Sequence, residues 1–324
     1  MAQKGPGKSH REGISIMALA DMFPDEASAA AWLESVVWPN GRHCPRCGST
    51  ETVNASATSG LPYYCQGCKK PFSVRIGSTL ERSKVPLRKW VFAIYLEMTS
   101  LKGVSSMKLH RDIDVTQKTA WFMLHRIREA WKGVDMALTG PVEADEMYVG
   151  GLRKNMSKAK RKQLEGRGPV GKSVVAGIKD RATKRVRAKV VGDTTAETLQ
   201  GFVRDHTAGG AMVYTDEASA YAGLARDFGH EAVNHGVGEY VRGQAHTNGI
   251  ESFWSTFKRA HKGVYHKISA KNLDRYVREF AGRHNVRELD TIEQMGAAVV
   301  GMVGQRLMYR DLIADNGLDS GARA

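Results

Sequence analysis

The feature that most constrains this chain is the spacing of its 4 cysteines, which are confined to one short stretch. Cys44 and Cys47 form a C-x2-C pair in "CPRC", and Cys65 and Cys68 form a second pair in "CQGC". Each pair presents two thiolates from one turn, and two such turns supply the four soft ligands of a tetrahedral zinc site. The spacing therefore predicts a structural zinc ribbon over residues 41–82, without catalysis at the metal. Four free or disulfide-bonded cysteines are the alternative.

The basic balance of the chain indicates a polyanionic partner. It holds 48 Lys and Arg residues against 34 Asp and Glu residues, a formal net charge of +14, which favours nucleic acid or an anionic membrane. Its apolar stretches are shorter than the about 20 residues that span a bilayer, and the opening "MAQKGPGKSHREG" lacks the apolar core of a secretion signal. We therefore expect a cytoplasmic, nucleoid-associated protein that binds double-stranded DNA and no membrane, with a disordered basic tail at residues 1–13.

Cations surround the cysteines and continue into a helical segment. The cations near the predicted ribbon make it a candidate DNA contact: Arg42, Arg46, Lys69, Lys70 and Arg75. A helical lead-in at residues 14–40 precedes the ribbon, and residues 84–135 follow it with helical periodicity. Within them, "GVSSMKLHRDIDVTQKTAWFMLHRIREAW" resembles a helix-turn-helix, and a plain helical hairpin is the alternative. We expect four side chains of its second helix to face DNA: Gln117, Lys118, Arg126 and Arg128.

The pattern over residues 138–290 is typical of a mixed α/β domain. Three β-rich runs, "PVEADEMYVGG", "KSVVAGIKD" and "RVRAKVVG", precede a helix near residues 195–207. Strands at "AMVYT" and "HEAVNH" follow, and then helices near residues 248–260 and 271–284. We therefore expect an α/β multidomain chain. Residues 291–324 are interpreted as a C-terminal tail without an assigned role.

One literal motif is rejected because of its context. "GRGPVGKS" at residues 166–173 matches the phosphate-binding G-x-x-x-x-G-K-S pattern, which requires a strand before it and a helix after it. Here a basic polar run precedes the motif, and the β-branched run "SVVAGIKD" follows it. We therefore expect no nucleotide cofactor. The segment is interpreted as a long cationic loop that either contacts DNA phosphates or is simply solvated.

Three acidic residues have the placement that a two-metal phosphoryl-transfer site would use. Asp145 lies in a predicted strand, and Asp216 ends the strand "AMVYTD". Glu251 opens the predicted helix in "HTNGIESFWSTFKR", beside Ser255 and Lys258. At a 3.6-residue period this helix has one apolar face: Ile250, Phe253, Trp254 and Phe257. Mg²⁺ prefers such oxygen ligands, and two ions activate the attacking oxygen and stabilise the leaving one. With 34 acidic residues in the chain, three can also be picked by chance, and other acids flank these: Glu143, Glu146 and Glu217.

Together the motifs resemble a known family, the DDE-type bacterial insertion-sequence transposases that carry an N-terminal zinc ribbon and an ISXO-type transposase domain. The resemblance rests on "YYCQGCKKPFSVRIGSTLERSKVPLRKWVFAIY", "VEADEMYVGG", "YTDEASAY" and "HTNGIESFWSTFKRAHKGVYHKIS", among other stretches. It implies an RNase H-like core with Asp145, Asp216 and Glu251 as the catalytic acids, and it places Lys258 near the scissile DNA. Two Mg²⁺ ions, or Mn²⁺, would serve the site, and the synapsis of two DNA ends implies a homo-oligomer.

The resemblance implies a DNA transposase that cuts at the ends of its insertion sequence and transfers the 3′-hydroxyl into target DNA. Two alternatives stay open. An RNase H-like nuclease or resolvase would use the same metals, and its products would be cut but never joined. A non-catalytic zinc-ribbon regulator would bind DNA without cleaving it.

Overall fold

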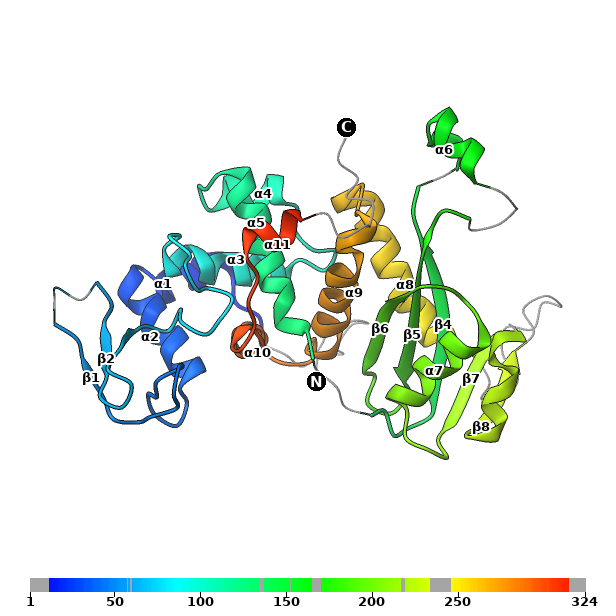
Figure 1. Ribbon diagram of the computed structural model, residues 1–324, viewed down its shortest axis with the longest axis horizontal. Coiled ribbons are helices and arrows are strands. Elements are labelled where there is room, and N and C mark those ends of the chain that lie inside the picture. Colours follow the sequence, from blue (N-terminus) through cyan, green and yellow to red (C-terminus); the bar gives the residue numbers. More distant parts are fainter. Residues whose placement is uncertain are drawn as a thin grey trace, which may run out of the picture. The chain divides into compact units, whose positions relative to one another are not determined.

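The computed structural model describes residues 12–56, 58, 60–133, 137–151, 153–164, 170–216, 219–233 and 246–314. These residues form two compact units, which are described separately (Figure 1). Unit 1 joins the chain up to Lys132 with Val286–Ala314, and unit 2 includes Gly133–Asn285. Most of the basic tail predicted at residues 1–13 lies outside the described residues. In the described parts of both units, no helix has the length and apolar character needed to cross a membrane.

Unit 1 begins with two helices and a small antiparallel sheet. Its first elements are α1 (Ile16–Met22), α2 (Glu26–Val37), β1 (Thr52–Asn54), β2 (Tyr63–Cys65) and β3 (Pro71–Phe72). A capping box fixes the start of α2, because the Ser28 N–H donates to Asp25 Oδ1 at 2.8 Å and the Asp25 N–H donates back to Ser28 Oγ. The strands pair in the order β1-β2-β3, and the cysteines flank this sheet.

The helical segment after the ribbon contains a helix-turn-helix arrangement. Its helices are α3 (Leu87–Thr99), α4 (Ser106–Asp112) and α5 (Gln117–Arg128). α4 packs against α5, and the turn between them places Asp114 in the left-handed region at φ 49°. Side-chain oxygens of Ser105 and Thr116 accept backbone N–H groups at the two helix starts, as N-caps do.

Two of the four side chains expected to face DNA are buried, so that part of the prediction is wrong. Arg126 is 7% exposed and donates from Nε to the Leu307 carbonyl at 3.3 Å. Arg128 is 1% exposed and forms an ion pair with Glu97 at 3.5 Å. Both are covered because α5 packs against α3 and also against a segment from the far end of the chain. The other two lie exposed in the first turn of α5: Gln117 and Lys118.

The segment expected to be a C-terminal tail is folded as far as residue 314. It contains α10 (Thr291–Met302) and α11 (Tyr309–Ile313). α10 packs on α2 and α3, and it approaches its neighbours so closely that a Cβ on Gly301 would lie 2.2 Å from the Ala130 carbonyl oxygen. Four of its side chains join the core of unit 1: Met295, Ala298, Val299 and Met302. Residues 315–324 lie outside the described residues.

The described part of unit 2 is built on a sheet in the order β6-β5-β4-β7-β8. The strands are β4 (Val142–Val149), β5 (Ser173–Asp180), β6 (Val186–Val191), β7 (Met212–Asp216) and β8 (Gly229–Val233). β5 pairs antiparallel with both β4 and β6, whereas β7 pairs parallel with both β4 and β8. Each strand falls on one of the five runs predicted from the sequence. This agreement arises because β-branched residues and the turns that bound a strand can be identified from neighbouring residues alone.

Helices cover both faces of this sheet (Figure 1). α7 (Ala196–His206) and the 3-10 segment η4 (Ser219–Arg226) share one hydrophobic cluster with Val142, Ala144 and Ile178. α8 (Asn248–Ala260) and α9 (Ala270–Asn285) share a second cluster with Met147, Val149 and Val175. Since strand side chains alternate between faces, the odd-numbered positions of β4 face α8. Of the acids on β4, Glu143 and Asp145 therefore point toward α8, the helix that carries Glu251.

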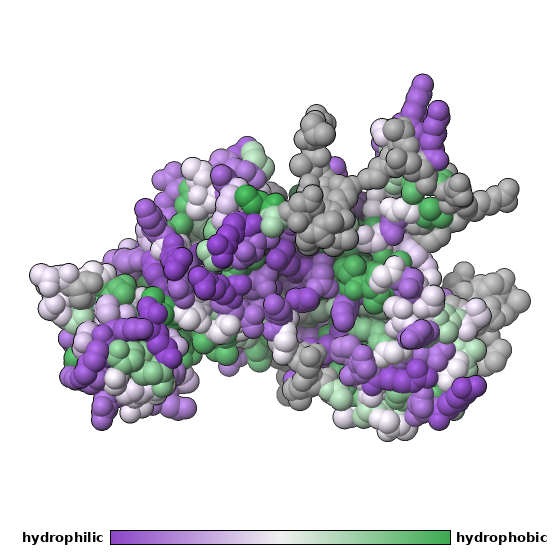
Figure 2. Space-filling model, viewed as in Figure 1, coloured by the Kyte–Doolittle hydropathy of each residue, from purple (hydrophilic) through white to green (hydrophobic). Residues whose placement is uncertain are grey.

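A basic segment joins β4 to β5. It contains α6 (Lys158–Gln163), and purple, hydrophilic residues project at the tip of this region in Figure 2. The rejected phosphate-binding motif lies here, and residues 165–169 fall outside the described residues. Its last residue, Ser173, begins strand β5, whereas a phosphate-cradling loop leads into a helix.

Candidate zinc site and active site

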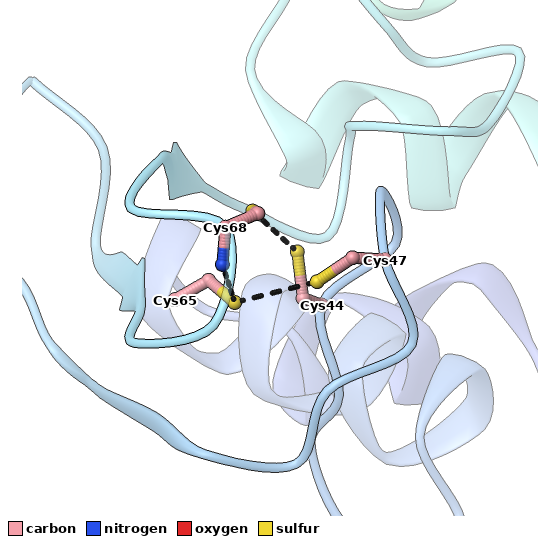
Figure 3. Close-up of side chains that lie close together, drawn as sticks. All are labelled: Cys44, Cys47, Cys65 and Cys68. Atoms are coloured by element: carbon pink, nitrogen blue, oxygen red, sulfur yellow. Dashed lines mark hydrogen bonds between the residues drawn. The ribbon is translucent and has the colours of Figure 1, made fainter.

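The four cysteines converge at one point (Figure 3). Their Sγ atoms all lie within 4.8 Å of one another, and all four are free thiols. The Cys44 and Cys68 sulfurs are 3.7 Å apart, and those of Cys47 and Cys65 are 3.6 Å apart. The Cys68 N–H, which donates to Cys65 Sγ, and the neighbouring cysteine side chains lower the pKa of Cys65 to about 7, whereas burial and those neighbours raise the pKa of Cys68 to about 12. This cluster can hold one structural Zn²⁺, as the spacing predicted.

The cations around the cysteines divide into two groups. Arg75 donates to the carbonyls of Ser83 and Val85 and pairs with Glu26, so it is committed to contacts within unit 1. It is therefore a poor candidate for DNA contact, contrary to expectation. Arg42 is partly covered by Tyr63, with its guanidinium 3.8 Å from the ring centroid. The remaining three are exposed: Arg46, Lys69 and Lys70.

The three predicted acids occupy neighbouring elements of unit 2. Asp145 lies in β4, Asp216 ends β7, and Glu251 stands in the first turn of α8. β4 pairs with β7 in parallel, with Val142 opposite Val213 and Glu143 opposite Tyr214, and Asp145 and Asp216 each lie two residues beyond this last pair. Both Asp residues occupy positions that alternate toward the α8 face. The structure therefore brings all three acids to one side of the sheet.

Electrostatics show that the carboxylates interact. Burial, the largest cause, and the nearby carboxylates of Glu146, Asp216 and Glu251 together raise the pKa of Asp145 to about 7. Burial and Asp216 also raise the pKa of Glu146, which accepts a hydrogen bond from the Tyr221 hydroxyl at 3.1 Å. Repelling acids of this kind become favourable once cations bind. The oxygen donors and their mutual repulsion fit a divalent-cation site.

The acids are more widely spaced than the cysteines. Among the described residues, the cysteine cluster is the one set of three or more potential metal ligands whose donor atoms all lie within 4.8 Å of one another. The three acids are not such a set. Glu146 is a further carboxylate near these acids. The sequence pattern did not distinguish it from the other acids that flank Asp145 and Asp216.

A pocket of about 490 Å³ opens between β4 and α8. It is lined by Asp145, Glu251, Trp254, Ser255, Lys258, Arg259 and Lys262. Lys258, predicted to accompany the acids, therefore shares a pocket with Asp145 and Glu251, whereas Asp216 is not among the lining residues. A second pocket, of about 670 Å³, also includes Lys258 and Lys262 and adds three groups that can bind anions: Lys172, His261 and His266. The acids in the first pocket could hold metal ions, and the cations that line both pockets could bind a polyanion. This arrangement suits a metal-assisted reaction on a polyanion.

A glycine permits α8 to approach the sheet beside Asp145. Gly177 on β5 pairs directly with Asp145, and a Cβ added there would lie 2.4 Å from Trp254 Cζ2. The indole therefore rests against bare backbone. Trp254 belongs to the apolar face predicted for this helix, all of which is buried: Ile250, Phe253, Trp254 and Phe257. That packing fixes the side of α8 on which Glu251 stands.

Sequence reasoning missed two buried groups near the start of α8. Glu143 is 2% exposed, and its Oε1 accepts from Arg181 Nε at 2.9 Å. Its Oε2 accepts the Ile250 N–H at 2.8 Å. The signal available in the sequence was a charged residue at an inward-facing position of a buried strand, where a charge requires partners.

Comparison with known proteins agrees with these features. Residues 137–285 match the model of the ISXO2-like transposase domain, and residues 24–71 match that of the transposase zinc-ribbon domain. Together they define a transposase with an N-terminal zinc ribbon. The chain is also 32% identical over 277 residues to an uncharacterized protein in transposable element ISH50 of Halobacterium salinarum, covering 82% of this chain and 92% of that protein. The chain belongs to the insertion-sequence transposases with an ISXO2-like domain, the family indicated by its motifs.

Proposed function

We propose that this protein cleaves DNA at the ends of its insertion sequence and joins the freed 3′-hydroxyl to target DNA by metal-dependent phosphoryl transfer. The observation that carries the proposal is the placement of Asp145, Asp216 and Glu251 on one side of a mixed sheet. Three antiparallel strands followed by two parallel ones, with the third acid on a helix, support an RNase H-like core.

Asp145, Asp216 and Glu251 would hold two Mg²⁺ ions, for which Mn²⁺ can substitute. Bound Mg²⁺ would supply an activated oxygen nucleophile and would neutralise charge on the leaving oxygen. Lys258, in the same pocket, would bind the phosphate that reacts.

The DNA strand would continue from this centre along the neighbouring cations. Lys258 and Lys262 line both pockets, so a strand that crosses the acids meets Lys172, His261 and His266 next. Backbone strain supports a functional role there, because His266 takes φ 56° directly after a π-helical turn at His261–Tyr265. Phosphate contacts of this kind position DNA without reading its sequence.

Unit 1 would recognise the terminal repeats. A Zn²⁺ ion held by the cysteines would fix the ribbon, and its exposed cations would contact phosphates: Arg46, Lys69 and Lys70. The exposed first turn of α5 would approach base edges with Gln117 and Lys118, since recognition helices contact bases through their N-terminal residues. Two ends held together require a homo-oligomer.

The experiment that tests this function uses DNA carrying the element's own ends and a plasmid target. Purified protein would be incubated with Mg²⁺ or EDTA beside Asp216→Asn. Asp227→Asn is the matched control, because Asp227 forms an exposed ion pair with Arg204 in the same unit. We expect Mg²⁺-dependent cleavage and joined products, lost in Asp216→Asn and kept in the control. Cleavage without joining would favour the nuclease, and DNA binding without cleavage in Mg²⁺ or Mn²⁺ would favour the regulator.

A further inference from the structure

A partly buried ion pair, between Glu143 and Arg181, lies on the same face of the sheet as the three acids. Glu143 stands two residues before Asp145 on β4, so both side chains point toward α8. The Glu143 carboxylate accepts from Arg181 Nε at 2.9 Å and from the Ile250 N–H at 2.8 Å. A strand carboxylate thus satisfies one of the free N–H groups at the start of α8, the helix that carries Glu251.

Arg181 extends this link to the remaining acid-bearing strand. Its guanidinium carbon lies 3.9 Å from the centroid of the Tyr214 ring, and Tyr214 stands two residues before Asp216 on β7. Arg181 also donates to the His246 carbonyl, just before α8. Through Glu143, Tyr214 and His246, one guanidinium connects β4, β7 and the start of α8. Those are the three elements that carry the acids.

At the N-cap of α8, the Thr247 side chain contacts Glu251 instead of capping the helix. Thr247 holds the N-cap position, but its side chain makes no capping hydrogen bond. Its Oγ1 donates instead to Glu251 Oε1 at 2.9 Å. Because Glu143 already accepts an N–H in the first turn, the Thr247 hydroxyl is available to orient the Glu251 carboxylate.

We propose that Glu143 and Arg181 are positioning residues that hold β4, β7 and α8 in the register required by Asp145, Asp216 and Glu251. This inference rests on the proposed function, because it concerns the geometry of that metal site. A buried ion pair is a weak source of stability, since desolvation of two charges offsets their attraction. Hydrogen bonds are directional, however, so a pair that bonds to several elements can specify how β4, β7 and α8 lie relative to one another.

Gly249 provides a test of this link that removes no charge. It lies in the first turn of α8, where a Cβ would be 2.6 Å from Glu143 Oε2. Alanine is the better helix former, so Gly249→Ala favours the helix itself but displaces the Glu143 carboxylate. Gly201 in α7 has nothing within 4 Å of its Cβ position, which makes Gly201→Ala the matched control.

The experiment measures metal affinity directly. Mn²⁺ binding to the zinc-loaded chain would be followed by electron paramagnetic resonance, with Asp145→Asn identifying the signal from the acids. Glu143→Gln and Gly249→Ala would be compared with two controls, Asp227→Asn and Gly201→Ala. The Mg²⁺ concentration for half-maximal end cleavage would be measured in parallel, and circular dichroism would check the fold.

We expect Glu143→Gln and Gly249→Ala to weaken Mn²⁺ binding, and to raise the Mg²⁺ requirement, by about 10–100-fold, the usual effect of groups that support metal ligands. Both controls should match the wild type. If both test variants titrate like the controls, the positioning role is wrong. If Glu143→Gln unfolds, Gly249→Ala decides alone. A wild type without an Asp145-dependent Mn²⁺ site would refute the proposed metal site itself.

Discussion

The raised pKa of Asp145 predicts that a proposed catalytic acid destabilises the metal-free protein. Asp145→Asn replaces the carboxyl with a neutral isostere, so it mimics the protonated form. The folded-state pKa of about 7 stands above the ordinary value of 3.8 for this carboxyl. Stability from this group is therefore fully present below about pH 4 and is lost as the pH rises through 7. Above that pH, the wild type carries the whole cost of the charged carboxylate and the variant does not.

The size of the effect follows from the shift. A rise from 3.8 to about 7 is about three pH units, which corresponds to a ceiling of about 4 kcal/mol. Relaxation of neighbouring side chains reduces this value, so we expect Asp145→Asn to gain about 1–4 kcal/mol at pH 8 in EDTA. For a unit of this size each kcal/mol moves the melting temperature by about 2–4 °C. At pH 4 the gain should nearly vanish.

Thermal unfolding from pH 4 to 8 tests this prediction, with the zinc site loaded and free divalent ions removed by EDTA. Mg²⁺ or Mn²⁺ added without EDTA should then stabilise the wild type more than the variant, because ligand binding to the folded state adds to stability. Asp227→Asn, at an exposed ion pair, should show no comparable gain. A variant that is less stable than the wild type at pH 8 in EDTA would refute the view that these acids repel one another in the folded state.

Four further changes test other parts of the molecule. Cys65→Ser should abolish stoichiometric zinc and lower the melting temperature of unit 1, as measured by metal analysis and calorimetry, because it removes one of four ligands. Gly177→Ala forces a Cβ to 2.4 Å from Trp254; it should destabilise unit 2 by about 1–3 kcal/mol in urea unfolding, and an unchanged midpoint would mean that the indole relocates freely. Lys118→Ala should weaken DNA binding in a salt-dependent gel-shift titration, whereas Arg126→Gln should lower stability and leave DNA affinity unchanged, since Arg126 is buried.

Local patterns identified most of the secondary structure of unit 2. The β-branched runs became β4 to β8, and the helices predicted near residues 195–207, 248–260 and 271–284 are α7, α8 and α9. Residue periodicity and turn chemistry act within a few positions, so a single sequence contains them. The apolar face of α8 was predicted correctly for the same reason.

Predictions about exposure failed where distant segments meet. Arg126 and Arg128 lie on a helix that the sequence suggested would face DNA, yet the segment around Leu307 and the helix α3 cover them. The supposed C-terminal tail supplies α10 to the core of unit 1. Neither outcome is encoded in the local pattern, because burial depends on what packs against a side chain from elsewhere in the chain.

The sequence by itself determined the cysteine ligand set, the order of strands and helices, and the family, since all of these depend on residue types at short spacings. Tertiary structure decided which acids share a site. Glu143, Asp145 and Glu146 are neighbours along one strand, but alternation and packing give them different surroundings. Glu143 is buried against the start of α8, Asp145 lines the pocket with Glu251, and Glu146 accepts from a tyrosine hydroxyl. Their chemistry differs because the low dielectric, the partners and the charges around each carboxyl come from elements that only the fold brings together.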